Sequence, residues 1–266
     1  MNDETGAKCK AIRVTFDMRQ IFPCEDLLSV PLLRLMAAAN DARYVMELSM
    51  PLMDKTQSAN EFDASIINGK LLYLFRLLCG HLYEAGRAFR ELDDAQRNLL
   101  DEIVRDNPKA KKYLAEIRDD FSKYPSGALH YSFLSPVRNR ISFHYQSEPL
   151  ARMLRKHNEA GDLKGTVIIT QYDGLSRHIV SDHLAMEIVQ EVLGGNSQEF
   201  EKSFYEKMGE VVDLAGQLSN LVDCVVLYLF SERKSAIFEE KDCEIQLTHE
   251  FGSLLDRLMK KRSSQS

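Results

Sequence analysis

The residues best suited to chemistry lie in one short stretch near the middle of the chain. Between residues 138 and 156 the sequence has a single acid, Glu148, although the whole chain has a formal net charge of -6. The cations of this stretch are Arg138, Arg140, Arg152, Arg155 and Lys156, and His144 lies among them. Such a concentration of cations predicts an anionic ligand, and the planar donor fork of arginine suits phosphate.

A histidine in this setting adds proton transfer. A histidine that titrates near neutral pH can move a proton during phosphodiester cleavage, and a nearby arginine can stabilise the charge that develops on the phosphate. His144 and Arg138 are the residues that suit these two roles. Proton transfer and charge stabilisation are the requirements of metal-independent RNA cleavage, in which the 2′-hydroxyl of the RNA itself attacks the phosphorus. DNA lacks that nucleophile.

The segment from Arg138 to Tyr145, R-N-R-I-S-F-H-Y, resembles the R-[N/D]-x4–6-H signature of HEPN domains. HEPN domains are small helical modules common in prokaryotic toxin and antiviral defence systems, and they usually pair as dimers whose two motifs line a cleft. Catalytic members cut RNA without a metal. The resemblance implies catalytic roles for Arg138 and His144, with support from Asn139. We expect RNA contacts from Arg140, Tyr145, Arg152, Arg155 and Lys156.

The same residues admit a second interpretation. At about 100° per residue, Val137, Ile141 and His144 share one face of a helix. His144 would then be a core histidine, with Arg138 and Arg140 in surface ion pairs, or this face would be the interface of a homodimer. The sequence therefore supports two functions. One is a HEPN-like endoribonuclease, and the other is a non-catalytic helical protein that uses a HEPN-like scaffold for dimerisation or for binding a partner or inhibitor protein.

Other catalytic and cofactor motifs are missing from the sequence. It contains no phosphate-binding glycine loop and no G-x-S-x-G nucleophile elbow. His178 and His183, with Asp182 beside them, match no established metal-binding spacing. We therefore expect neither a cofactor nor a metal.

The composition predicts a soluble cytoplasmic protein. The five cysteines are scattered without C-x-x-C spacing, which fits a reducing compartment. The apolar stretch Leu221 to Phe230 contains Asp223 and is too short to span a bilayer. The first residues carry the wrong charge for a signal peptide.

Helix signals precede the motif. Serine caps helices and proline suits their first turn, so Ser29-Val30-Pro31 predicts one helix start and Ser135-Pro136 predicts another, for a motif helix over 136–157. Apolar residues at helical spacing and the break at Asn107-Pro108 define the others. The helices predicted before the motif helix cover residues 29–53, 60–92, 94–105 and 109–122.

The pattern changes after the motif. Residues 165–171 and 175–180 flank Asp173-Gly174, a dipeptide favoured in tight turns, and predict a β-hairpin near residues 165–180. Further helices are predicted from Ser181-Asp182 to Gly194, from Asn196 to about Glu232, and over 250–261.

These elements predict a mainly α fold, a HEPN-like helical bundle with one inserted β-hairpin. We expect residues 1–28 to be a tail and lead-in and residues 29–160 to form the HEPN-like bundle. Residues 161–262 are expected to supply the hairpin and the C-terminal helices, packed on the same domain.

Overall fold

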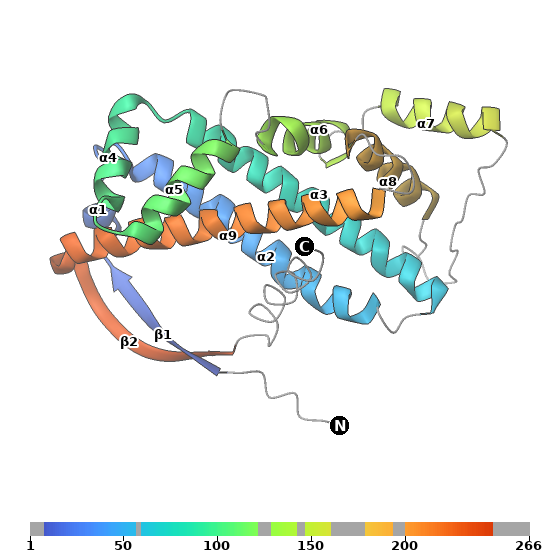
Figure 1. Ribbon diagram of the computed structural model, residues 1–266. Coiled ribbons are helices and arrows are strands. Elements are labelled where there is room, and N and C mark those ends of the chain that lie inside the picture. Colours follow the sequence, from blue (N-terminus) through green and yellow to red (C-terminus); the bar gives the residue numbers. More distant parts are fainter. Residues whose placement is uncertain are drawn as a thin grey trace.

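A computed structural model describes residues 8–56, 60–121, 129–142, 147–160, 179–193 and 200–246 of the 266-residue chain. In these residues the chain is mainly helical, as predicted, with a single antiparallel pair of strands (Figure 1). In chain order the elements are β1 (Lys8–Phe16), α1 (Met18–Ile21), α2 (Ser29–Thr56), α3 (Glu61–Arg90), α4 (Asp94–Val104), α5 (Pro108–Asp120), η1 (His130–Leu134), α6 (Ser135–Val137), η2 (Arg138–Ser142), α7 (Ser147–Ala160), α8 (Ile179–Leu193), α9 (Phe200–Glu232), η3 (Lys234–Ala236) and β2 (Ile237–Gln246).

The helix starts predicted before the motif are confirmed, and local capping residues define those of α3, α4 and α5. Asn60 accepts a hydrogen bond from the backbone N–H of Asp63 at 2.9 Å and caps α3. Asp93 and Gln96 form a reciprocal capping box at α4. Asn107 caps α5, whose first residue is a proline. Each cap satisfies a backbone donor that the first helical turn leaves unpaired.

The long helices α2, α3 and α9 lie side by side in the bundle (Figure 1), and α5 packs along α9. The residues of α9 that are buried recur every three or four positions, which is the spacing of one helix face. They include Val211, Leu214, Leu218, Leu221 and Val225.

The apolar part of α9 is longer than the stretch singled out in the sequence. By length and composition alone, Ser203–Glu232 is able to cross a membrane. One face of this helix is nevertheless buried in the bundle. Core packing is therefore sufficient to explain its apolar composition.

The motif helix begins earlier than predicted. Residues 129–142 form one helical run, so Ser135 and Pro136 lie inside it and do not open it. A proline inside a helix loses a hydrogen bond and crowds the preceding turn. The widened π turn at His130–Leu134, directly before this proline, accommodates that conflict. A second helix, α7, continues from Ser147 to Ala160.

The observed strand pair differs in position from the predicted hairpin. β1 pairs with β2 in antiparallel register from Lys8↔Gln246 to Phe16↔Ile237. The segment predicted as a tail and lead-in thus contains β1 and α1. Of the hairpin predicted at 165–180, residues 165–178 lie outside the described residues, and Ile179 and Val180 are the first residues of α8. The helix predicted over 250–261 also lies outside the described residues. The helix predicted from Asn196 to about Glu232 corresponds to α9, but Asn196 itself lies outside the described residues.

Aromatic contacts join the strand pair to the bundle. The ring of Phe16 lies 5.0 Å from that of Phe230 and 6.0 Å from that of Phe22, between centroids. The backbone N–H of Asp17 donates to the carbonyl of Ala236 at 2.9 Å. The strands are far apart in sequence, so their pairing depends on the packed helices.

Candidate functional site

The guanidinium of Arg138 contacts two residues of α3 and its own neighbour Asn139. Its Nη2 lies 3.2 Å from Oε1 of Glu84, and its Nη1 donates to Oδ1 of Asn139 at 3.1 Å. Its guanidinium carbon lies 5.1 Å from the centroid of the Tyr83 ring. The side chain of Arg138 is 21% exposed. The guanidinium is thus oriented by neighbours, with its Nε buried, and the side chain keeps part of its surface exposed to solvent.

Asn139 supports this arrangement from the same helix. Its Nδ2 donates to Oγ of Ser135 at 3.2 Å, and this bond orients the amide oxygen that accepts from Arg138. Asn139 thus contacts both Arg138 and the preceding turn, and its role in a reaction stays a prediction.

The backbone of the motif is unusual. Residues Arg138–Ser142 form a π-helical turn, and a second π turn, His130–Leu134, lies just before it. Such turns are rare and occur often at functional sites, because they re-aim side chains within a helix. The two turns flank the short segment that contains Pro136.

The other predicted site residues fall into separate groups. Arg140 lies half-buried on η2 next to Arg138. Arg152 on α7 contacts Glu148 at 3.3 Å and Glu191 of α8 at 2.5 Å, so it is tied to these two helices and not to Arg138. Its hydrogen bond to Glu191 raises the pKa of Arg152.

The remaining predicted residues add cations to α7 or lie beyond what the structure describes. Arg155 and Lys156 are exposed on α7. His144 and Tyr145 lie outside the described residues. The structure therefore brings Arg138 and Asn139 into contact, places Arg140 on the same helical turn, and leaves the geometry of His144 as a prediction.

His130 is a neighbour of the motif that sequence reasoning missed. Its side chain is 1% exposed. Its imidazole stacks on the Tyr83 ring at 4.8 Å between centroids and an interplanar angle of 14°. The same tyrosine ring lies against Arg138, so His130 and Arg138 are linked through Tyr83. The one hint in the sequence was a histidine in an apolar run, which does not reveal a partner on a distant helix.

His130 is not suited to acid–base work at neutral pH. Burial, and secondarily the positive charge of Arg90, lowers its pKa to about 4. An imidazole with that pKa is neutral at pH 7 and is a poor proton acceptor. His130 is therefore not a candidate for the proton transfer that the resemblance predicts for His144.

Gly86 makes room for this buried histidine. A Cβ atom at residue 86 would lie 2.6 Å from Nδ1 of His130 and 2.9 Å from Cδ1 of Phe121. We expect Gly86→Ala to destabilise the protein by about 1–3 kcal/mol, the usual cost of overpacking a core. The matched control is Gly216→Ala on α9, where nothing lies within 4 Å of the added atom. It should stabilise α9 by about 0.5–1 kcal/mol through helix propensity. Urea unfolding measures both, and equal stabilities would contradict the packing described here.

The low pKa of His130 also predicts how stability depends on pH. The unfolded imidazole titrates near its ordinary value of 6.5 and the folded one at about 4, so the folded state binds fewer protons between these values. The contribution of His130 is complete above pH 6.5 and is lost as the pH falls toward 4. We expect it to be about 2 kcal/mol weaker at pH 5 than at pH 7.5. Between pH 7.5 and pH 5, the free energy of unfolding of His130→Gln should therefore fall by about 2 kcal/mol less than that of the parent. Parallel pH profiles of stability for the two proteins would refute this prediction.

Metal ligands do not gather in the part of the chain that the structure describes. No three His, Cys, Asp or Glu side chains lie close enough there to hold an ion. His81, which lies one helical turn before Glu84, instead contacts Asp41 through Nδ1 at 3.2 Å.

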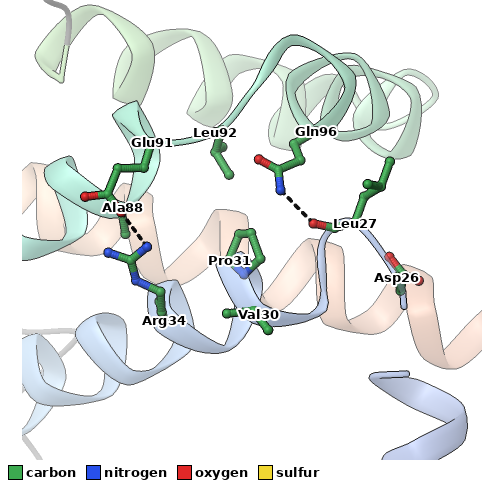
Figure 2. Close-up of a pocket in the computed structure, with 9 residues that line it drawn as sticks. All are labelled: Asp26, Leu27, Val30, Pro31, Arg34, Ala88, Glu91, Leu92 and Gln96. Atoms are coloured by element: carbon green, nitrogen blue, oxygen red, sulfur yellow. Dashed lines mark hydrogen bonds and ion pairs between the residues drawn. The ribbon is translucent and has the colours of Figure 1, made fainter. Parts of the chain in front are cut away.

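A pocket of about 380 Å³ lies where the start of α2 faces the connection from α3 to α4 (Figure 2). Three of its polar residues bond one another or the pocket backbone, and Asp26 pairs with Arg233 outside the pocket. Nη1 of Arg34 lies 2.6 Å from Oε2 of Glu91, and Nε2 of Gln96 donates to the carbonyl of Leu27 at 2.9 Å (Figure 2). The pocket contains no residue of the predicted motif.

Comparison with known proteins adds no assignment: no family model, no curated protein and no solved structure matches the chain significantly.

Proposed function

We propose that the protein is a HEPN-like, metal-independent endoribonuclease that acts in the cytoplasm. The observation that carries this proposal is the placement of Arg138. Its guanidinium is oriented by Glu84, Asn139 and Tyr83, its side chain is partly exposed to solvent, and the residue opens a π turn that begins an R-N-x4-H motif. An oriented arginine at the surface suits a phosphate that gains charge during reaction.

In the proposed reaction the RNA supplies its own nucleophile. The 2′-oxygen forms a bond to phosphorus while the bond from phosphorus to the 5′-oxygen breaks. His144 accepts the proton of the 2′-hydroxyl, and the leaving 5′-oxygen gains a proton from His144 or from its counterpart in a second subunit. Arg138 stabilises the charge on the non-bridging oxygens. The products are a 2′,3′-cyclic phosphate and a 5′-hydroxyl.

The proposal includes a homodimer that pairs through the segment 136–157. A dimer would bring two motifs to one cleft and would give each cut access to two histidines. Sedimentation at micromolar concentration tests this part, and a monomer that never self-associates would remove it.

One observation favours a second function, a non-catalytic interaction protein on the same scaffold. The charge of Arg138 is already balanced by Glu84, as it would be in a structural ion pair. The two functions are separated by incubating the purified protein with single-stranded RNA in the presence of EDTA. The ribonuclease cuts the RNA and the interaction protein leaves it intact.

A further inference from the structure

Arg138 is one end of a row of alternating charges along α3. Glu84, Arg87 and Glu91 are three and four residues apart and share one face of this helix. Nη1 of Arg87 lies 3.3 Å from Oε2 of Glu84, and its Nη2 lies 3.8 Å from Oε1 of Glu91. At one end of the row Arg138 pairs with Glu84 at 3.2 Å, and at the other end Arg34 of α2 pairs with Glu91 at 2.6 Å. Three arginines thus hold two carboxylates between them.

The row runs from the motif to the pocket shown in Figure 2. Arg34 and Glu91, paired at 2.6 Å, line that pocket, whereas Arg138 belongs to the π turn of the motif. The rise of an α-helix is about 1.5 Å per residue, so the backbones of Glu84 and Glu91 are about 10 Å apart along α3. Their carboxylates lean toward each other and both contact the guanidinium of Arg87. Two anion positions in sequence, each flanked by arginines, suit successive charges of an extended polyanion better than a single small ion.

Both carboxylates can be displaced by another anion. The side chains of Glu84 and Glu91 are 45% and 49% exposed, and that of Arg87 is 49% exposed. Ion pairs this open to water shift an equilibrium by about fivefold at most. A phosphate can accept two parallel hydrogen bonds from a guanidinium and has more acceptor oxygens than a carboxylate, so it can take the place of each carboxylate.

We propose that Arg34, Arg87 and Arg138 form a track for the phosphates of single-stranded RNA, and that Glu84 and Glu91 occupy the phosphate positions in the free protein. This inference rests on the proposed function, because it takes RNA as the polyanion that reaches the motif. It adds two phosphate-binding residues, Arg34 and Arg87, that the motif does not contain.

Binding of an RNA that the protein cannot cut tests the track. The probe is a short fluorescein-labelled 2′-O-methyl oligoribonucleotide, whose blocked 2′-oxygens prevent cleavage, and the readout is fluorescence anisotropy over a range of salt concentrations. Arg34→Ala and Arg87→Ala should each weaken binding about three- to tenfold and reduce the salt slope by about 0.7, the value of one phosphate contact on a single strand. The lysine variants at both positions keep the charge and should keep the slope.

The carboxylates give the opposite expectation. Glu84→Gln and Glu91→Gln should each strengthen binding of the 2′-O-methyl probe about three- to fivefold, because the competing anion is gone. The matched controls are Arg105→Ala and Glu102→Gln, which form a similarly exposed pair on α4, away from the row, at 3.6 Å. Both controls should stay within about twofold of the parent, since a single screened surface charge contributes little.

The outcomes separate this inference from the proposed function. If the parent cuts RNA but Arg34→Ala and Arg87→Ala bind the probe as tightly as the parent does, the track is refuted and the ribonuclease stands. If the parent cuts nothing but the four row variants behave as expected, the track stands and the ribonuclease falls. Equal losses in Arg105→Ala, or no binding of the probe by the parent and by Glu84→Gln, also refute the track.

Discussion

His144→Ala lowers the rate of RNA cleavage by about 10²- to 10⁴-fold, the contribution typical of a general acid–base group. This is the largest effect we expect, because attack by the 2′-hydroxyl requires a proton acceptor and the neighbouring histidine is unsuited to that role. Burial keeps the pKa of His130 at about 4, so it cannot replace His144 at neutral pH. Single-turnover cleavage of a labelled RNA measures the loss.

A control histidine and a stability measurement make this prediction specific. His81→Ala removes another histidine with an acidic partner, at 3.2 Å from Asp41, and should retain the parental rate. Both variants should keep the parental melting temperature if His144 is not a packed residue. A His144→Ala variant that melts earlier and cuts at the parental rate would instead identify a core histidine.

Arg138→Ala lowers the cleavage rate by about 10²- to 10³-fold, as expected for removal of a donor aimed at the charge of the transition state. Arg138→Lys should restore only part of the rate. Lysine keeps the charge but has neither the planar fork that reaches Glu84 and Asn139 nor the flat face that lies on Tyr83. The same single-turnover assay measures both variants.

Arg118 provides the matched control for Arg138. Its side chain is 35% exposed and makes a two-pronged contact with Asp101, at 2.7 and 2.9 Å, between α5 and α4. Arg118→Ala should cut RNA at the parental rate. If Arg138→Ala also cuts at that rate but loses thermal stability, the contact with Glu84 is structural and Arg138 has no role in the reaction.

The helices before the motif could be predicted because their starts depend on neighbouring residues. Asn60, Asp93 and Asn107 each cap a helix through a side chain that bonds a backbone N–H three residues on. Ser135-Pro136 looked like the same signal and was wrong as a helix start. The π turn before it lets the helix run through the proline, and a one-dimensional pattern does not show that turn.

The strand pair could not be predicted from local pattern. β2, I-F-E-E-K-D-C-E-I-Q, is rich in charges and has no clear alternation, and its partner β1 lies more than two hundred residues earlier in the chain. Such a pair is stabilised by packing against the rest of the fold, here by the contact of Phe16 with Phe230. Non-local pairing of this kind overrides weak intrinsic preference.

The candidate site was partly visible in the sequence. The types and spacing of Arg138 and Asn139 pointed to phosphate chemistry, and the structure brings these two into contact. Their partners Tyr83 and Glu84 come from a helix more than fifty residues earlier, and no sequence spacing connects them to the motif. Tertiary packing alone brings these groups together.

The proposed ribonuclease activity is tested most directly by incubating the purified protein with single-stranded RNA and a DNA of the same sequence, with EDTA in excess. We expect the RNA to be cut to fragments with 2′,3′-cyclic phosphate and 5′-hydroxyl ends while the DNA stays intact, because only RNA carries the attacking hydroxyl and no step of the proposed reaction needs a metal. RNA left intact by folded protein would contradict the proposed activity, and so would cleavage that appears only when a divalent metal is added.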